Sequence, residues 1–298
     1  MKKYLIFILI SSLSIVYADA QDWDKVEIKT EKITDNIYCL FGRRGNIGVF
    51  VGEDGIMMID DQYAPLSDKI SAAIAEISDK PIKYLLNTHW HGDHTGGNEN
   101  FGNKGAIIIA HNNVRKRLST DQFIKAFSRN VPAKAETFWP EITFEKDISI
   151  HINDEDVLFF HSHNAHTDGD GIVFFTKSNV VHMGDTYFKD RYPYIDLSSG
   201  GSVDGMIANA NKVLFLSDQN TKIIPGHGAV SNKAELTKYR DMLMTLRDRV
   251  KAALEEEKTI EEMKAANLTA GFPEEWNTGF ITAERIIDII YTDLTREK

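Results

Sequence analysis

The sequence predicts an α/β protein in which two β-sheets lie between outer layers of helices. Two observations predict it. Short apolar runs with strand-like patterning are punctuated by Gly and Asp, and segments with helical spacing of apolar residues lie among and after them. Strands and helices mixed in this order indicate two packed sheets covered by helices.

The N-terminal residues have the pattern of a secretory signal peptide. Lys2 and Lys3 precede an apolar run at residues 4–16, and Ala18-Asp19-Ala20 follows it. The run is shorter than the roughly 20 apolar residues that a membrane-spanning helix needs. We expect cleavage after Ala20 and a mature domain at residues 21–298 that is secreted to the periplasm, without stable membrane association. An uncleaved membrane anchor is the alternative.

The strand-like and helical segments follow in order along the mature chain. The first half contains strand-like runs at residues 37–41, 47–51, 56–60, 82–87 and 106–110. One helical segment, at residues 64–77, lies among them. Further strand-like runs follow at residues 148–152, 157–161, 172–176, 180–183 and 222–224. Helical patterns occupy residues 203–216, 231–256, 259–266 and 283–294. The helices from about residue 231 have apolar faces that suit either a cap on the sandwich or a dimer contact.

Charge and cysteine content exclude some classes of function. The formal net charge is −10, with 44 acidic and 34 basic residues. Nucleic-acid binding depends on Lys and Arg that neutralise phosphates, so the acidic balance argues against it. The single cysteine, Cys39, excludes an intramolecular disulfide, and its apolar neighbours predict a buried structural thiol.

One segment concentrates metal-ligand chemistry. His89, His91, Asp93 and His94 lie within six residues, directly after the apolar run at 82–87. Such a cluster is costly unless it is paired, and imidazole and carboxylate are groups that Zn²⁺ accepts. His89 and His91 are spaced to share one metal, whereas Asp93 and His94 turn towards a second.

Three later segments supply the further ligands that a two-metal site needs. His166 precedes the run at 172–176, Asp185 follows the run at 180–183, and His227 follows the run at 222–224. Each lies on a turn beside glycine, which permits close backbone approach. Taken singly, each resembles an ordinary polar turn residue; taken together and in order, they predict a metal site.

This order, HxHxDH followed by His, Asp and His, resembles the metallo-β-lactamase superfamily over roughly residues 30–230. The resemblance implies a four-layer αββα sandwich and two zinc ions per chain. It implies that the first zinc is held by His89, His91 and His166, that the second is held by Asp93, His94 and His227, and that Asp185 bridges them. Asp60, at the end of an early strand, matches an aspartate that normally supports the metal loop without binding metal.

A two-zinc site predicts hydrolysis of an activated acyl bond in a small-molecule substrate. Paired ions lower the pKa of a shared water towards about 7, which makes hydroxide available to attack a carbonyl carbon. We expect Asp93 to orient that hydroxide or pass its proton to the leaving group. The ligand set resembles the third β-lactamase subclass, while an aspartate at 185 is similar to glyoxalase II thioesterases and lactonases. A β-lactamase-like activity, a lactonase or thioesterase, and a non-catalytic metal-binding accessory protein therefore all stay open.

Substrate contacts are expected from Tyr63 and from the long loop at residues 187–201, with Lys189, Arg191, Tyr192 and Tyr194. An ordinary surface loop is the competing interpretation. Arg43 and Arg44 occupy an expected hairpin loop near the mouth of the site, where they would either steer an anionic substrate or be solvated. The remaining histidines are expected on the surface or in supporting positions, with one at a helix start: His161, His163, His182 and His111 (the helix start).

Overall fold

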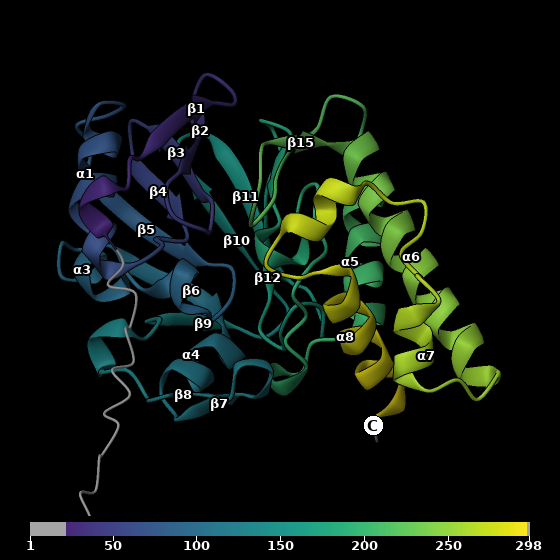
Figure 1. Cartoon of the computed structure of the whole chain (residues 1–298). Helices are drawn as coiled ribbons and strands as arrows, with labels where there is room; N and C mark the ends of the chain where they lie inside the picture. The colour runs from purple at the N-terminus through teal and green to yellow at the C-terminus, as the bar shows by residue number, and fades with distance from the viewer. Residues whose placement is uncertain (1–21, 297–298) are drawn as a thin grey trace, which may run out of the picture.

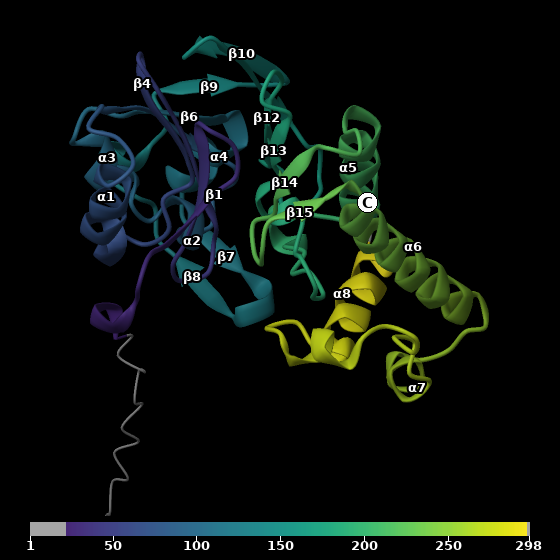
Figure 2. The same ribbon diagram turned by 90° about the horizontal axis from the view of Figure 1, so that it is seen from above.

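The computed structural model describes residues 22–296, so the expected signal peptide at residues 1–20 lies outside the described part. Figure 1 shows two central sheets with helices on both outer sides. In the turned view of Figure 2, α1 (Ser67–Ala75) and α3 (Asn98–Gly102) cover one side, and α5 (Val203–Leu216) and α6 (Lys233–Glu255) cover the other. This is the α/β sandwich that the sequence predicts. Within residues 22–296, no helix has the length and apolar character to cross a membrane.

The first sheet has seven strands in the spatial order β1-β2-β3-β4-β5-β6-β9. From β1 to β4 the neighbours are antiparallel, and from β4 to β9 they are parallel. The strands are β1 (Lys29–Lys32), β2 (Ile37–Phe41), β3 (Ile47–Gly52), β4 (Gly55–Ile59), β5 (Ile82–Asn87), β6 (Ile107–His111) and β9 (Ile142–Phe144).

The second sheet has six strands in the spatial order β10-β11-β12-β13-β14-β15. All neighbours are antiparallel except β13 and β14, which are parallel and therefore end at the same edge. The strands are β10 (Asp147–Ile152), β11 (Glu155–His161), β12 (Gly171–Phe175), β13 (Val180–His182), β14 (Lys222–Ile224) and β15 (Ser231–Asn232).

Shorter elements complete the chain. A separate two-stranded hairpin is formed by β7 (Gln122–Ile124) and β8 (Arg129–Val131). The remaining α-helices are α2 (Gly92–Thr95), α4 (Asn112–Leu118), α7 (Ile260–Ala265) and α8 (Ala283–Thr295). Single 3-10 turns occupy Trp23–Lys25, Ala64–Leu66, Lys125–Phe127, Glu136–Phe138, Gly184–Thr186, Leu197–Ser199 and Glu274–Thr278.

Local sequence explains where the long helices begin. Ser202 and Asn232 are the N-caps of α5 and α6, and their side chains accept hydrogen bonds from the first-turn amides. Thr259 and Glu262 form a reciprocal capping box at the start of α7. His111 caps α4 by accepting from the amide of Asn113, which confirms the expected helix-start position of this histidine.

The packing of β4 shows how the layers are filled. Alternate side chains of a strand point to opposite faces, so Met57 and Ile59 face the second sheet while Ile56 and Met58 face α1. All five residues of β4 are buried. A strand buried on both faces needs an unbroken apolar run, and this explains the sequence of β4. Cys39 lies in the inter-sheet core as a buried free thiol, as the sequence predicts.

The structure departs from the predicted elements mainly where elements are short. Residues 64–77 divide into a 3-10 turn and α1, and residues 231–256 begin with β15 before α6 starts. β1 and the β7–β8 hairpin were not predicted, because a strand of three or four mostly exposed residues carries no clear periodic pattern.

Candidate metal centre

The loop after β5 presents four of the predicted ligands at one edge of the first sheet. It runs into the single turn of α2, where the amide of His94 donates to the carbonyl of His91 at 3.0 Å. His89 and His94 are fully or almost fully buried, His91 is nearly so, and Asp93 is partly exposed. The buried strand β5 thus ends in a loop of ligand side chains.

The second sheet contributes the other three predicted ligands. His166 lies in the loop before β12, Asp185 follows β13, and His227 follows β14. Because β13 and β14 are parallel, their ends bring Asp185 and His227 together, and the amide of Gly226 donates to the carbonyl of Gly184 at 2.7 Å. All seven side chains therefore meet between the two sheets.

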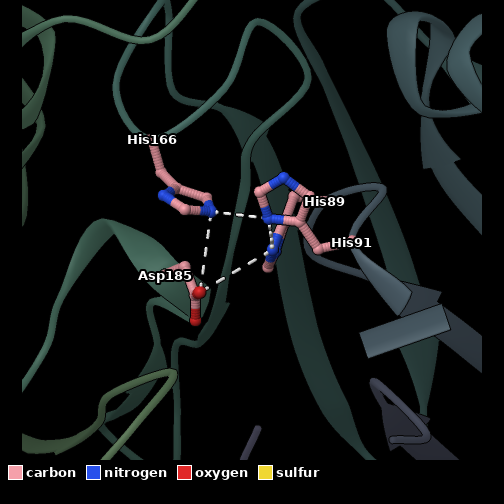
Figure 3. A group of neighbouring side chains, drawn as sticks. All are labelled: His89, His91, His166 and Asp185. Atoms are coloured by element: carbon pink, nitrogen blue, oxygen red, sulfur yellow. Dashed lines mark hydrogen bonds and ion pairs between the residues drawn. The ribbon is translucent and has the colours of Figure 1, made fainter. Parts of the chain in front are cut away.

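Three histidines form the first group. The Nε2 of His89 lies 3.1 Å from the Nδ1 of His91, which lies 2.9 Å from the Nε2 of His166 (Figure 3). The three rings are nearly perpendicular to one another, and their facing nitrogens lie close enough together to bind one ion. With a carboxylate oxygen of Asp185, these atoms lie within 4.8 Å of one another and could hold a metal ion.

The second group consists of Asp93, His94 and His227. The Oδ2 of Asp93 lies 3.6 Å from the Nε2 of His227 and 3.9 Å from the Nε2 of His94. Their three ligand atoms also lie within 4.8 Å of one another. One carboxylate and two imidazoles of this group could hold a second ion.

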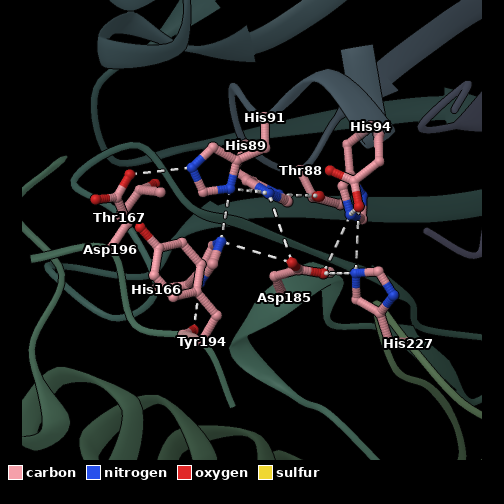
Figure 4. A network of polar contacts seen from close by, with 12 residues as sticks. Thr88, His89, His91, His94, His166, Thr167, Asp185, Tyr194, Asp196 and His227 are labelled. Carbon is pink, nitrogen blue, oxygen red and sulfur yellow. Dashed lines mark hydrogen bonds and ion pairs between the residues drawn. The ribbon is translucent and has the colours of Figure 1, made fainter. Parts of the chain in front are cut away.

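Asp185 lies between the two groups. Its Oδ2 lies 3.6 Å from the Nε2 of His166 and 3.8 Å from that of His89. Its Oδ1 lies 3.1 Å from the Nε2 of His94 and 3.2 Å from that of His227. Figure 4 shows this carboxylate reaching both groups with its two oxygens.

The buried donor atoms fit cations. The Nε2 of His94 and the Oδ1 of Asp185 are buried and form no hydrogen bond with any described residue, although they are close enough for an ion pair. Burial lowers the pKa of His166 to about 4 and holds that of His89 well below its ordinary value. Both imidazoles are therefore neutral at pH 7, the form that binds metal.

Hydrogen bonds fix the orientation of the ligand rings. Asp60 accepts from the Nδ1 of His94 at 2.7 Å, and from the amide and hydroxyl of Thr88 at 2.7 and 2.8 Å. Because Thr88 donates its hydroxyl to Asp60, its oxygen accepts from the Nδ1 of His89 at 3.1 Å. Asp60 therefore supports the metal loop from behind, and each of these rings directs its Nε2 lone pair into the site.

Two supporting contacts were missed by the sequence analysis. Asp196 lies 3.0 Å from the Nε2 of His91, and the carbonyl of Tyr194 accepts from the Nδ1 of His166 at 2.8 Å. Both come from the loop that the sequence analysis assigned to substrate contacts. Although burial opposes it, hydrogen bonds from His91 and the serines at 198 and 199 hold the pKa of Asp196 below its ordinary range. The only sequence signal was the Asp-Leu-Ser-Ser capping pattern.

The ligand side chains open into a cleft of about 1020 Å³. Asp93, His91, Asp185 and His227 lie at its base. Its walls come from the β2–β3 turn, the segment after β4, the β7–β8 hairpin, the loop after β13 and the segment before α8, and they combine apolar side chains, many of them aromatic, with several basic ones. A mostly apolar wall with a few polar groups is typical of small-molecule sites.

Most of the residues predicted to contact substrate line the cleft, but one does not. Tyr63, Arg191, Tyr192 and Tyr194 line the cleft, as does Arg44. The Nζ of Lys189 lies 3.0 Å from Asp190 and 3.9 Å from Glu235, and its side chain is not among those that line the cleft, so its role as a substrate contact stays a prediction. The direction of each side chain in this irregular loop is set by packing against neighbouring elements, which the sequence alone did not reveal.

The remaining histidines form no metal group among the described residues. His111 and His161 stack at 3.8 Å between ring centroids, and His163 lies edge-on to His161 at 5.7 Å. Stacked rings direct their nitrogens past each other, which does not suit coordination of one ion. His182 is fully buried, not on the surface, and burial lowers its pKa to about 4.

The fold and this centre define a class of protein: a two-sheet α/β sandwich with a histidine–aspartate metal site at the edge of its sheets. The chain belongs to the metallo-beta-lactamase superfamily, whose family model matches residues 40–246. The members of this superfamily are typically metal-dependent hydrolases.

Relatives found by sequence comparison have the names of two different enzymes. A hydroxyacylglutathione hydrolase from Polaromonas sp. is 27% identical over 179 residues, which are 59% of this chain and 60% of that protein. The chain thus spans about 60% of that relative's length. A metallo-beta-lactamase type 2 from Elizabethkingia meningoseptica is 23% identical over 193 residues, which are 62% of this chain and 72% of that protein.

Solved structures share the fold. A metallo-beta-lactamase from Pontibacter korlensis has a TM-score of 0.60 and 15% identity, and the match covers 73% of this chain and 99% of that one. A sec-alkylsulfatase from Pseudomonas sp. has a TM-score of 0.66 and 14% identity, covering 89% of this chain and 50% of that one. Identities this low establish the common sandwich alone.

Proposed function

We propose that this protein is a dinuclear zinc hydrolase that cleaves activated acyl bonds in small molecules. One observation carries the proposal: the carboxylate of Asp185 faces three-histidine and Asp-His-His groups with opposite oxygens. A carboxylate in this position would be shared by the two ions that the groups would hold, as in two-metal hydrolytic sites.

The proposed ligands follow the two groups. His89, His91 and His166 would hold the first ion, and Asp93, His94 and His227 the second, with Asp185 shared between them. When bound, paired zinc ions make water acidic enough to act at neutral pH and polarise the carbonyl of the substrate. Imidazole with carboxylate also accepts manganese or iron, so the test includes those metals.

Asp93 is the proposed catalytic residue of the chain itself. Its side chain is 19% exposed and lines the cleft, so that a bound substrate can approach the carboxylate. Although burial opposes it, the neighbouring His94 and His227 lower the pKa of Asp93, so that the carboxylate is charged. In this state, the carboxylate of Asp93 can accept a proton from the attacking water and return it to the leaving group.

The leading substrate class is the β-lactam, and the second is the thioester or lactone. The first is supported by the ligand set and by the relative named metallo-beta-lactamase type 2. The second is supported by Asp185 and by the relatives named hydroxyacylglutathione hydrolase. Both classes present a carbonyl that the same base of the cleft would polarise.

A side-by-side assay separates these substrates. Zinc-loaded protein is given a chromogenic cephalosporin, an acyl-homoserine lactone and a glutathione thioester, each with and without a chelator. Chelator-sensitive cleavage of the cephalosporin alone supports the leading class, and cleavage of the lactone or thioester alone supports the second. If fully loaded protein cleaves none of them, a metal-binding accessory role replaces hydrolysis.

We also propose export to the periplasm with cleavage after Ala20. Residues 1–20 combine a basic start, an apolar run and an Ala-x-Ala ending. N-terminal sequencing of the protein recovered from a periplasmic fraction should begin at Gln21. Recovery of the full chain in the membrane fraction would instead support the uncleaved anchor.

A further inference from the structure

The mouth of the cleft is formed by an aromatic and basic cluster from separate segments. Phe280 of the segment before α8 lies 5.3 Å from Phe127 and 6.4 Å from Tyr194. The guanidinium of Arg44 lies 5.5 Å from the ring centre of Phe280. Phe280 lies beyond residues 40–246, so the part of the chain outside the family match contributes to the site. We call Arg44, Phe127 and Phe280 the rim cluster.

The two phenylalanines of the rim cluster are not core residues. Phe127 is 38% exposed and Phe280 is 48% exposed, although both line the cleft. Exposing two adjoining aromatic rings to water is unfavourable in the unbound protein. At the mouth of a cleft, such a surface indicates a binding site for apolar groups. The rim therefore offers an apolar contact in the same cleft that the metal groups line.

The cleft is also basic, in contrast with the acidic chain. Arg44, Arg129 and Arg191 line it, and none of the three has a carboxylate within ion-pair distance in residues 22–296. Arg117, which also lines the cleft, is paired with Asp168, and outside the cleft Arg240 and Arg247 are paired with aspartates. Positive charge without a protein partner in a concave site attracts anions.

Two of these arginines, Arg44 and Arg129, line the same cleft as Tyr63 and Asp93. Burial raises the pKa of the Tyr63 hydroxyl, the carboxylate of Asp93 acts in the same direction, and the guanidinium groups of Arg44, Arg43 and Arg129 oppose them. Positive and negative side chains therefore both act on this phenol in the cleft wall. Arg44 has a φ of 73°, a left-handed conformation of the turn between β2 and β3, and this turn carries its side chain into the lining of the cleft.

We propose that this cleft selects acyl substrates that carry a carboxylate and an aromatic or aliphatic group. Arg44 and Arg129 bind the carboxylate, and Phe127 and Phe280 contact the apolar group. Guanidinium groups bind carboxylates through paired hydrogen bonds, which orients the substrate as well as attracting it. The inference rests on the proposed function, because the acyl carbonyl is placed between the rim and the metal groups.

A matched pair of esters tests the charge recognition. The mono-para-nitrophenyl ester of adipic acid keeps one free carboxylate, and methyl para-nitrophenyl adipate is its neutral counterpart. We expect Arg44→Gln and Arg129→Gln each to raise KM for the acid about fivefold, the effect of a partly exposed ion pair. The neutral ester should be unaffected. Lys251→Gln removes the same charge from the exposed face of α6 and should change neither ester.

A binding measurement keeps failure of this inference distinct from failure of hydrolysis. Hydrocinnamate and its neutral amide are titrated into zinc-loaded protein by calorimetry. Tighter binding of hydrocinnamate that is lost in both arginine variants supports the inference, even if neither ester is cleaved. Equal affinities for acid and amide, or equal effects of the variants on both esters, overturn it while hydrolysis itself stands.

The apolar contact has its own comparison. Phe280→Ala should weaken hydrocinnamate binding several-fold and leave propionate binding unchanged, because only the phenyl group contacts the rim. Phe215→Ala is the control, since Phe215 is 86% exposed on α5 and does not line the cleft. If Phe280→Ala weakens the binding of hydrocinnamate and propionate to the same extent, the site is generally disturbed and the assigned contact is contradicted.

Discussion

The carboxylate of Asp196 accepts a hydrogen bond from the Nε2 of His91 at 3.0 Å and so fixes the tautomer of that ring. With its Nε2 protonated, His91 presents the lone pair of Nδ1 to the nitrogens of His89 and His166. Asp196 is itself held by the amides and hydroxyls of Ser198 and Ser199. A loop distant in sequence therefore determines how the first histidine group is presented.

Replacing Asp196 should weaken metal binding more than it weakens the fold. Asp196→Ala leaves the Nε2 of His91 without an acceptor, and loss of such a supporting carboxylate lowers metal affinity by about 10- to 100-fold. Competition with a chelating dye measures the affinity. Asp190→Asn, in the same loop but exposed, is the control. Unchanged affinity in Asp196→Ala would show that His91 is oriented by other contacts.

Replacing Asp93 should abolish most activity. Asp93→Ala removes both a proposed ligand of the second ion and the proposed proton acceptor, so the rate should fall by about two orders of magnitude or more. Steady-state kinetics together with metal content by mass spectrometry check this. Asp68→Ala, an exposed carboxylate on α1, should behave as wild type. A near-normal rate in Asp93→Ala would refute the role assigned to it.

Two glycines beside the site should differ in how well they tolerate an added methyl group. A Cβ on Gly226 would overlap the Oδ1 of Asp185 and the backbone of Gly184, whereas a Cβ on Gly92 would meet nothing within 4 Å. Gly226→Ala should therefore displace Asp185, lose metal and lower stability by about 1–3 kcal/mol. Urea unfolding and metal content of both variants provide the test. Equal tolerance at the two positions would mean that the close packing around Asp185 does not exist in solution.

Stability should fall in mild acid because of His111. Burial, followed by the neighbouring His161, lowers the pKa of His111 from 6.5 to about 4. Its Nδ1 accepts from the amide of Asn113 and its Nε2 faces the carbonyl of Glu145, so protonation would break the cap of α4. A lowered folded-state pKa gives stability that is complete above pH 6.5 and is lost as pH falls towards 4.

The His111 contribution can be isolated by a cap-preserving substitution. His111→Asn keeps an N-cap acceptor and removes the titration, so its unfolding free energy should decline less than wild type between pH 7 and pH 4.5. We expect the two declines in unfolding free energy to differ by about 1 kcal/mol. The difference is small because the neighbouring rings are partly exposed and solvent screens their charges. Parallel pH profiles for the two proteins would exclude His111 as the titrating group.

Much of the site could be predicted because its chemistry is local. His89, His91, Asp93 and His94 lie in one short segment after a buried strand, and each later ligand follows or precedes an apolar run. Strand ends at one edge of a sheet bring such turns together, so their order along the chain was informative. Asp60 also ends a strand, and its bonds to His94 and Thr88 follow from that position.

By itself, the sequence determined the layered fold, the buried strands and the identities of the seven convergent side chains, because apolar periodicity and residue type are properties of single segments. Only the tertiary structure decided that Asp196 supports His91, that Lys189 turns towards Glu235, and that Phe280 reaches Arg44 across the cleft. These contacts join loops separated by many residues, and loop direction is set by packing against neighbours, for which no periodic signal exists in the chain.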